Sequence, residues 1–410
     1  MATILAYTSP AMGHMLPISA LLCELARRGH TVVLRTLSSC VPIARGLGFY
    51  ADAIDPRIEE IELDDWKGTN QRRALELGVA VFARRAPYEA ADLADAVAEA
   101  HPDAVLVDVN CWGALSVAEV GGLPWACFAP YTPPLRASGV PPFGLGLRPL
   151  PGVAGRLRDA AARAVVIRSV EGVMLPPINT LRARLAVGPV ATMDEFLRRA
   201  PLLLVASGTP FQSPQTDWGE TVAMIGPCVL DPGPSAAPDW LSAIDRPIVL
   251  VTTSSEKQAD DTLVRTAIAA LADEPVHTVA TLPAGLPDGL AAGANATLCR
   301  QVPHGALLDR AVCAVTHGGM GVTQKALDRA VPVCVVPYGR DQFEVARRVE
   351  VARCGTRLPA KKLAPARLRA KVREAMTMTD GAQRVAAGFA ATGGTVRGAE
   401  LFEQRVLGSG

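Results

Sequence analysis

The stretch from Thr316 to Gln342 constrains the fold more than any other part of the chain. It reads T-H-G-G-M-G-V-T-Q-K-A-L-D-R-A-V-P-V-C-V-V-P-Y-G-R-D-Q, which predicts the end of a strand, a glycine-rich turn, a helix and a second apolar strand. A similar strand, helix and strand open the chain between Thr3 and Arg35, and further short apolar strands are expected at 104–107, at 125–129 and from Pro247 onward. Because strands that alternate with helices indicate parallel pairing, we expect an α/β chain with two doubly wound parallel sheets.

Length and a proline-rich segment predict two domains. The 410 residues exceed the usual size of one domain. Residues 226–240 contain four prolines, a composition that breaks both helices and strands, and we expect the interdomain linker there. The N-terminal domain is therefore predicted at 1–225 and the C-terminal domain at 241–381. A helical tail at 382–410 is expected to pack across the two domains.

Composition argues against several classes of partner. Lys and Arg total 41 against 40 Asp and Glu, so no basic field is present to attract nucleic acid. The nine cysteines show no C-x-x-C spacing and the histidines are scattered, so no metal site is predicted and the cysteines are expected to be reduced. No charged leader followed by an apolar run opens the chain, and no apolar stretch approaches the roughly 20 residues that span a bilayer. We expect a cytoplasmic protein without a transmembrane segment.

The glycine-rich turn predicts a site for a diphosphate. Gly318, Gly319 and Gly321 allow backbone N–H groups to approach an anion, and the helix expected from Val322 directs its positive end to the same place. His317 adds a donor beside the turn. A tight connection without a ligand is the alternative explanation for such a turn.

Asp341 and Gln342 follow the next strand and offer an acceptor and an amide that suit sugar hydroxyls. A nucleotide-sugar is therefore the most economical ligand. The two residues also suit the cap of the helix that follows them, and the two roles are compatible.

His14 and Asp108 are the candidate catalytic pair. His14 is expected between the first strand and the first helix, and Asp108 ends the apolar run A-V-L-V-D, so both lie at the carboxyl ends of strands, where open parallel sheets bind ligands. A neutral imidazole takes a proton from a hydroxyl at physiological pH, and a carboxylate on its other nitrogen would orient it. Alone, each residue is more often a helix cap or a solvated side chain. Fingerprints for dinucleotide cofactors and for Walker-type nucleotide binding are absent.

Four motifs together resemble a known family. They are G-H-x-x-P at Gly13, the strand-ending Asp108, V-P-H at Val302 with T-H-G-G about a dozen residues later, and the closing D-Q pair. The chain resembles the UDP-glycosyltransferases, and more narrowly the actinobacterial natural-product and macrolide glycosyltransferases of glycosyltransferase family 1. The resemblance implies the GT-B fold, in which two Rossmann-like domains face each other across a cleft. The first domain would bind mainly the acceptor and the second mainly the nucleotide-sugar donor.

The resemblance also implies roles for single residues. His14 would deprotonate the acceptor hydroxyl while Asp108 holds it, and attack opposite the leaving diphosphate would invert an α-linked donor to a β-glycoside. The remaining implied roles concern the donor. The diphosphate would be bound by His317 and the amides around Gly318, Gly319, Gly321 and Val322, with Ser254 and Ser255 near the phosphates. The base would lie at Gln301 and Val302, and the sugar would be held by Asp341 and Gln342. No metal or other cofactor is then required.

Two departures from the family concern the choice of donor. Gln301 stands where many relatives have a Trp that stacks on the base, and Lys325 stands where they have a Glu that binds both ribose hydroxyls. Lys325 cannot accept hydrogen bonds. UDP-glucose is the expected donor, and a dTDP-sugar is the alternative.

The acceptor is expected to be a hydrophobic hydroxyl compound such as an aromatic or polyketide aglycone. Apolar side chains in segments that could line the cleft are Phe82, Tyr88, Trp112, Phe143, Met174 and Phe211, of which Phe82, Trp112 and Phe143 are the chosen candidates. The predicted activity is that of an inverting hexosyltransferase. The alternatives are a GT-B nucleotide-sugar epimerase, which the G-H-x-x-P and H-G-G-M-G motifs disfavour, and a non-catalytic helper of glycosyltransferases.

Overall fold

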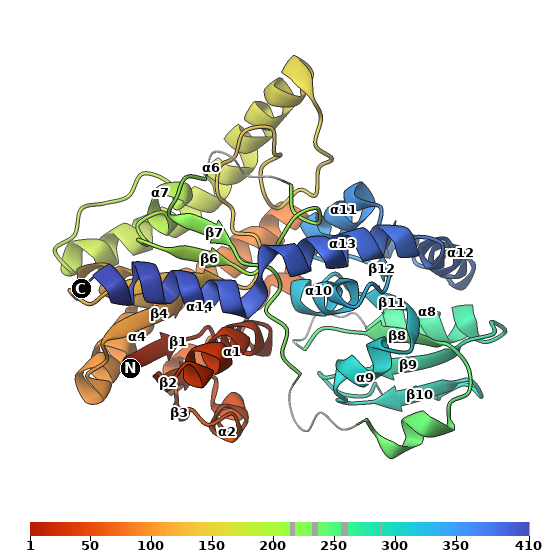
Figure 1. Cartoon of the computed structure of the whole chain (residues 1–410). Coiled ribbons are helices and arrows are strands. Elements are labelled where there is room, and N and C mark those ends of the chain that lie inside the picture. Colours follow the sequence, from red (N-terminus) through yellow and green to blue (C-terminus); the bar gives the residue numbers. More distant parts are fainter. Residues whose placement is uncertain (214–217, 232–236, 256–260, 288, 410) are drawn as a thin grey trace.

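The structure is a computed structural model that describes residues 1–213, 218–231, 237–255, 261–287 and 289–409. It contains two parallel sheets, each covered by helices (Figure 1). The two doubly wound sheets expected from the sequence are therefore confirmed. Part of the predicted linker, residues 232–236, lies outside the described residues.

The first sheet is formed by the N-terminal part of the chain. Within the described residues its strand order is β3-β2-β1-β4-β5-β6-β7, with every pair parallel. The strands are β1 (Thr3–Tyr7), β2 (Thr31–Thr36), β3 (Tyr50–Ala53), β4 (Ala104–Asp108), β5 (Trp125–Ala129), β6 (Leu203–Val205) and β7 (Val222–Met224). The order changes direction between β1 and β4, and such a switch point opens a crevice at the carboxyl ends of the strands.

The second sheet has the order β10-β9-β8-β11-β12-β13 within the described residues, and its pairs are also parallel. Its strands are β8 (Ile248–Thr252), β9 (His277–Thr281), β10 (Ala296–Cys299), β11 (Ala311–Thr316), β12 (Val333–Val335) and β13 (Gly355–Arg357). The switch point here lies between β8 and β11, which places the glycine-rich turn after β11 at the opening of this crevice.

Helices cover both faces of each sheet. In the first domain they are α1 (Met12–Arg27), α2 (Val41–Gly46), α3 (Pro56–Glu60), α4 (Gln71–Ala100), α5 (Trp112–Val120), α6 (Gly152–Arg184) and α7 (Met193–Leu197). In the second they are α8 (Asp261–Leu271), α9 (His304–Leu308), α10 (Met320–Asp328), α11 (Gln342–Ala352) and α12 (Pro365–Met376). Among the described helices, none combines the length and the apolar character needed to cross a membrane.

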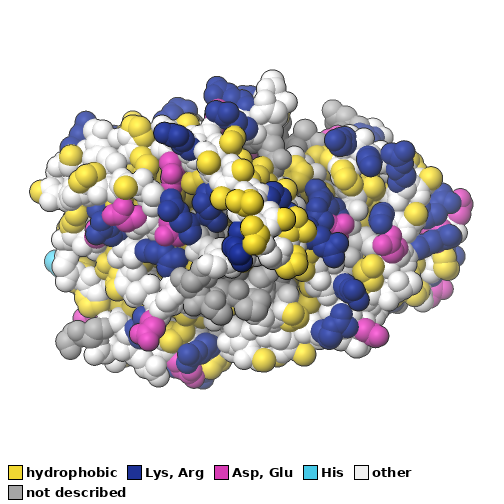
Figure 2. Space-filling model, turned by 90° about the horizontal axis from the view of Figure 1, so that it is seen from above, with side chains coloured by type: hydrophobic (Ala, Val, Ile, Leu, Met, Phe, Trp, Pro, Cys, Tyr) yellow, Lys and Arg dark blue, Asp and Glu magenta, His cyan; other side chains and the backbone are white. Residues whose placement is uncertain are grey.

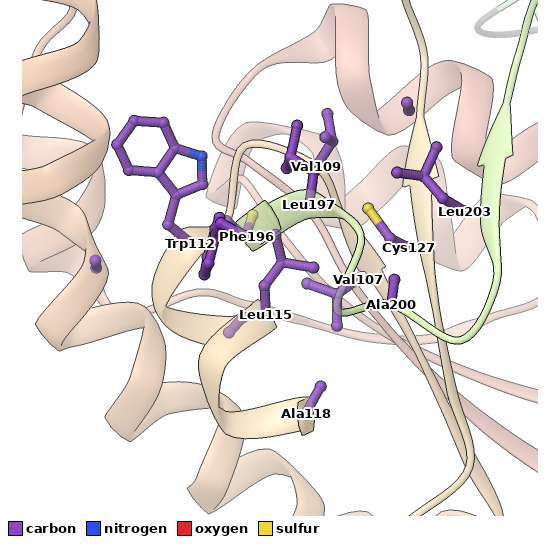
Figure 3. Close-up of a cluster of buried hydrophobic side chains, with 14 of the residues drawn as sticks. Val107, Val109, Trp112, Leu115, Ala118, Cys127, Phe196, Leu197, Ala200 and Leu203 are labelled. Carbon is purple, nitrogen blue, oxygen red and sulfur yellow. The ribbon is translucent and has the colours of Figure 1, made fainter. Parts of the chain in front are cut away.

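The core of the first domain lies in two layers because strand side chains alternate between faces. Leu5, Val105 and Val107 point to the side covered by α4, α5 and α6. Ile4 and Leu106 point to the other side, which α1 covers. Figure 3 shows part of the first layer, where Val107 and Val109 meet Trp112 and Leu115 of α5 and side chains of the α7 region. These strands read as continuous apolar runs because both of their faces are buried.

Two C-terminal helices cross between the domains (Figure 1). In α13 (Thr379–Thr392), Val385 and Phe389 pack into the core of the second domain. In α14 (Gly394–Arg405), Leu401 and Phe402 pack into the first domain beside α1. The tail therefore belongs to both cores. It begins at Thr379, three residues before the position expected from the sequence.

Candidate active site

A cavity of about 1810 Å³ lies at the carboxyl ends of both sheets. The first domain lines it with the segments that follow β1, β4 and β5, and the second domain with those that follow β8, β11 and β12. The candidate residues of both domains therefore surround one space.

His14 and Asp108 form a direct pair in this cavity. The Nδ1 atom of His14 lies 2.7 Å from Oδ2 of Asp108. The Asp108 side chain is fully buried, whereas 16% of the His14 side chain is exposed. His14 lies in the first turn of α1 rather than before the helix, because α1 begins at Met12. The alternative role of Asp108 as the N-cap of the next helix is wrong, since Cys111 holds that position.

Asn110 and Tyr131 extend the pair, and neither was predicted from the sequence. Asn110 donates its backbone N–H to Oδ1 of Asp108 (2.8 Å), and its Nδ2 lies 3.3 Å from Nε2 of His14. The Tyr131 hydroxyl donates to Oδ1 of Asn110 at 2.8 Å, which orients the amide so that its nitrogen faces His14. Asn110 could have been found, because it is a polar residue two positions beyond Asp108 at the same strand end.

The glycine-rich turn has the geometry of an anion site. Gly318 has φ +97°, a conformation that glycine adopts without strain. A Cβ at Gly319 would lie 2.5 Å from Nε2 of His317, so the turn and the imidazole fit only with glycine there. A Cβ at Gly321 would meet no atom within 4 Å, so this side of the turn is open. Helix α10 begins at Met320, two residues earlier than expected, and its first N–H groups lie at the cavity.

His317 is buried beside this turn. Its Nδ1 lies 3.5 Å from the carbonyl oxygen of Thr252, and burial lowers its pKa to about 4. The side chain is therefore neutral at physiological pH and carries one N–H donor. A bound anion would favour the protonated imidazole and so raise this pKa.

The other donor-side candidates also line the cavity. Ser254 is buried and Ser255 is exposed, and both follow β8. Gln301 is exposed and reaches the other domain, where its Nε2 lies 3.9 Å from the sulfur of Met12. Val302 is half-buried and packs against the core of the second domain.

Asp341 and Gln342 begin α11 and differ in environment. Burial raises the pKa of Asp341, and the positive charges of Arg340 and Arg348 oppose this shift. His14 and Asp341, from opposite domains, both line the cavity. Asp341 is the N-cap residue of α11 but makes no side-chain capping bond.

Gln342 holds the loop that precedes it. Its Oε1 accepts from the backbone N–H groups of Tyr338 (2.7 Å) and Gly339 (3.0 Å), and the side chain is almost fully buried. The amide oxygen of Gln342 therefore shapes the wall of the cavity. It belongs to the same wall as Asp341.

An ion pair between the domains flanks Asp341. Arg340 binds Asp65 through two bonds, Nε to Oδ2 (2.7 Å) and Nη2 to Oδ1 (2.8 Å). The side chains are 22% and 8% exposed, so the pair is partly shielded from water. Arg340 also adopts φ +53°, an uncommon conformation for a residue with a side chain. No sequence pattern indicated this pair, because its partners are far apart in the chain.

Lys325 is engaged by the linker. Its Nζ lies 2.5 Å from Oδ1 of Asp231 and 3.0 Å from the carbonyl oxygen of Leu230. Asp231 also accepts from the backbone N–H groups of His304 (3.3 Å) and Gly305 (2.9 Å). Asp231 and Lys325 both line the cavity, so a carboxylate and an ammonium group occupy the region where the family resemblance implies a Glu.

The three chosen acceptor candidates line the cavity on the side of the first domain. Phe82 and Trp112 make an edge-to-face contact with ring centroids 5.5 Å apart, and Phe143 lies 6.2 Å from Tyr131. The wider set of apolar residues was partly wrong. Met174 and Phe211 are fully buried core residues, and the ring of Tyr88 stacks under Arg57 instead. Core packing explains all three, since apolar residues near a cleft serve the interior more often than the ligand.

The ligands that a metal ion would need are not gathered in the described part of the chain. No group of three or more His, Cys, Asp or Glu side chains there has a metal-binding arrangement. The nine cysteines are free thiols, and seven of them are buried.

Comparisons with known proteins agree on one family. Residues 262–395 match the domain described as "Erythromycin biosynthesis protein CIII-like, C-terminal domain". The chain is 29% identical over 386 residues to 4'-demethylrebeccamycin synthase of Lentzea aerocolonigenes, with 91% of each chain covered.

Two solved structures share the fold. The glycosyltransferase of kitacinnamycin superposes with a TM-score of 0.76 at 22% identity, covering 99% of both chains. The spinosyn rhamnosyltransferase SpnG, solved with thymidine diphosphate, superposes with a TM-score of 0.73 at 16% identity, covering 98% of this chain and 99% of its own. The expected GT-B fold is confirmed.

Proposed function

We propose that the chain is a glycosyltransferase of family 1, an inverting enzyme that moves a hexose from a nucleotide-sugar to a hydroxyl of a hydrophobic natural product. One observation carries the proposal. The His14–Asp108 pair and the glycine-rich turn after β11 come from different domains and line the same cavity. Glycosyl transfer requires a group that accepts the proton of the acceptor hydroxyl and a binding site for the leaving diphosphate.

His14 acts as the general base. The acceptor O–H bond breaks as its proton moves to Nε2 of His14, and the acceptor oxygen bonds to the anomeric carbon. Asp108 accepts the Nδ1–H of His14, which leaves Nε2 as the basic nitrogen and stabilises the imidazolium that forms. The acceptor hydroxyl would bind beside Asn110, because the amide of Asn110 contacts Nε2 of His14.

The second domain stabilises the leaving group. The bond between the anomeric carbon and the diphosphate breaks, and its electron pair leaves with the diphosphate. The first N–H groups of α10 and the His317 imidazole meet the growing negative charge. The proposed reaction uses no metal ion, because N–H donors and the positive end of the helix dipole would stabilise the leaving diphosphate. Asp341 would accept hydrogen bonds from the sugar hydroxyls, while Gln342 shapes the wall beside it.

Two donors fit this site. UDP-glucose comes first, because the D-Q pair resembles that of enzymes that use glucose-type donors. A dTDP-sugar comes second, because Lys325 and Asp231 are bound to each other where the family pattern places a Glu for the ribose hydroxyls. Thymidine diphosphate lacks the ribose 2′-hydroxyl and so has less need of that acceptor. The complex of the solved rhamnosyltransferase with thymidine diphosphate supports this second candidate.

The acceptor is proposed to be an aromatic or polyketide-like hydroxyl compound. Phe82, Trp112 and Phe143 line the first-domain side of the cavity near His14, and such a wall suits a flat apolar molecule.

Nucleotide binding is the first test. Calorimetric titration with UDP and with dTDP should show micromolar binding of at least one, and their ratio identifies the donor class. The same protein should then release the preferred nucleoside diphosphate when given its sugar conjugate and a panel of phenolic and polyketide acceptors. Binding of neither nucleotide would overturn the transferase proposal and favour the helper alternative.

Replacing the general base separates catalysis from binding. His14→Ala should lower turnover by roughly 100-fold to 10,000-fold and leave nucleotide affinity unchanged, because His14 acts on the acceptor. The matched control is His101→Asn, which changes a surface imidazole at a left-handed position that Asn tolerates. Equal turnover of His14→Ala and the wild-type protein would remove His14 from the mechanism.

A further inference from the structure

The first half of helix α6 carries an exposed apolar stripe. Val153, Leu157 and Val165 are 62%, 67% and 62% exposed, and Ala161 completes the four-residue spacing. Residues spaced by four lie on one face of a helix. The later half of α6 instead buries Val170, Met174 and Ile178 in the core of the first domain. Figure 1 shows the helix projecting beyond the body of the molecule.

Arginines flank this stripe. Between residues 148 and 168 the chain has Arg148, Arg156, Arg158, Arg163 and Arg168, and the one acidic residue is Asp159. Asp159 is buried and pairs with Arg158 at 2.6 Å, so it does not neutralise the other four. Seen from above, hydrophobic side chains form a patch at the position of α6, with Lys and Arg side chains around it (Figure 2). The protein as a whole has a net charge of only +1, so this basic character is local.

We propose that this face of α6 docks the protein on an anionic lipid surface. An amphipathic helix with aliphatic residues on one face and arginines along its flanks inserts its apolar side at the boundary between headgroups and acyl chains. The arginines would interact with anionic headgroups. A second copy of this chain fits less well, because a two-fold contact would bring the same arginines together.

The same helix also lines the cavity. Ile167 and Val170 of α6 belong to the cavity wall on the acceptor side. Docking through the outer face of α6 would therefore hold the acceptor side of the cavity close to the lipid. Hydrophobic acceptors concentrate in a lipid layer, so docking would bring the cavity close to the acceptors of the proposed reaction. The docking proposal does not itself depend on that reaction.

Vesicle sedimentation tests the proposal directly. The full chain should sediment with vesicles of phosphatidylglycerol and phosphatidylcholine and much less with pure phosphatidylcholine, and its binding to the anionic vesicles should weaken at high salt. The triple variant Arg156→Gln, Arg163→Gln, Arg168→Gln should weaken binding to anionic vesicles on the order of 100-fold. The double variant Val153→Gln, Leu157→Gln should also weaken it, at any salt concentration. Circular dichroism checks that the variants fold.

A matched control is Val396→Gln, which changes an exposed valine of α14 (46% exposed) and should bind as the wild-type protein does. Equal sedimentation with neutral and anionic vesicles, or unchanged binding of the triple variant, would overturn the proposal. A concentration-dependent dimer that Leu157→Gln abolishes would assign the face to a second copy, and capture of an acidic protein without lipid binding would assign it to that partner. None of these outcomes affects the nucleotide titration that tests the proposed function.

Discussion

Two acidic residues near the His14–Asp108 pair, Glu89 and Asp92, have raised pKa values because they are buried. Glu89 of α4 is almost fully buried and accepts the backbone N–H of Gly113 at 2.9 Å. Burial raises its pKa to about 8, and the charges of Asp108 and Asp92 act in the same direction. The Tyr7 hydroxyl donates to Asp92 at 2.7 Å nearby. Glu89 therefore holds its proton at neutral pH.

Glu89 gives a pH-dependent prediction of stability. Its pKa rises from about 4.5 in the unfolded chain to about 8 in the folded protein, so its contribution to stability is complete below about pH 4.5 and is lost as the pH rises toward 8. Glu89→Gln keeps an acceptor for Gly113 and cannot ionise. The variant should melt at a higher temperature than wild type at pH 8 and at a similar temperature at pH 5. Thermal unfolding across this range measures the difference, and a constant difference across pH would contradict the assignment.

Single residues were predictable where strand ends determine their place. His14, Asp108 and His317 each follow or end an apolar run, and the topology of a parallel sheet brings such positions to one edge. Asp231 and Asp65 were not predictable. Asp231 lies in the linker and Asp65 in the short 3-10 helix Asp65–Lys67, and their contacts with Lys325 and Arg340 depend on how distant segments return to the cavity.

At the scale of elements, the turn between β11 and α10 is the most tightly constrained segment of the site. Gly318 needs its positive φ, and His317 fills the space beside Gly319. The helix that follows has no capping side chain at its start, because its N-cap is Gly319. A ligand that accepts hydrogen bonds is then the natural partner for its first N–H groups.

Gly319→Ala should disrupt this turn. The new Cβ would overlap Nε2 of His317, and the buried imidazole or the turn must move. We expect nucleoside diphosphate affinity to fall roughly 10-fold to 100-fold, the usual effect of overpacking by 1–3 kcal/mol. The matched control is Gly172→Ala on an exposed part of α6, where a Cβ meets no atom within 4 Å and nucleotide affinity should not change. Equal affinity of Gly319→Ala and the wild-type protein would mean that the diphosphate binds elsewhere.

Strands were predictable where their apolar run was clear in the sequence. The five-residue and six-residue strands were evident in this way, and so was β12, whose three residues belong to the longer apolar run 331–336, whereas β6, β7 and β13, with three residues each, were not predicted. Such short strands depend on their neighbours in the sheet rather than on their own composition. The 33-residue helix α6 was also missed. It contains Pro176 and Pro177, and proline usually indicates a helix end.

At the scale of the whole molecule, two kinds of contact join the domains. Helices α13 and α14 place apolar residues in both cores. Polar contacts also join the domains. Gln324 donates to the carbonyl oxygen of Ala206 at 2.9 Å, and Glu344 accepts from Gly144 and Gly146 at 3.0 and 2.7 Å. Polar contacts of this kind can break and re-form as ligands enter, whereas the apolar contacts of the tail keep the domains together.

The Arg340–Asp65 pair is the contact that connects domain closure to the donor site. Arg340 precedes Asp341, so the distance between the domains and the position of the Asp341 carboxylate, which is proposed to bind the sugar, depend on each other. Asp65→Asn and Arg340→Gln should each lower kcat/KM for the donor by roughly 10-fold to 100-fold, because removing one partner of a partly buried pair costs about 1–3 kcal/mol. The double variant should be no worse than the poorer single variant, since both changes remove the same interaction.

The control for these single and double variants of Arg340 and Asp65 is an exposed ion pair within one domain. Arg45 and Asp52 lie 3.1 Å apart with side chains 61% and 60% exposed, and exposed pairs contribute little. Arg45→Gln should therefore leave kcat/KM unchanged. Small-angle scattering adds a second measurement, because loss of the Arg340–Asp65 pair should increase the radius of gyration of the nucleotide-bound protein, whereas Arg45→Gln should not. Additive effects of the two single variants with an unchanged radius would show that Arg340 acts on Asp341 locally and that closure relies on the Glu344 contacts instead.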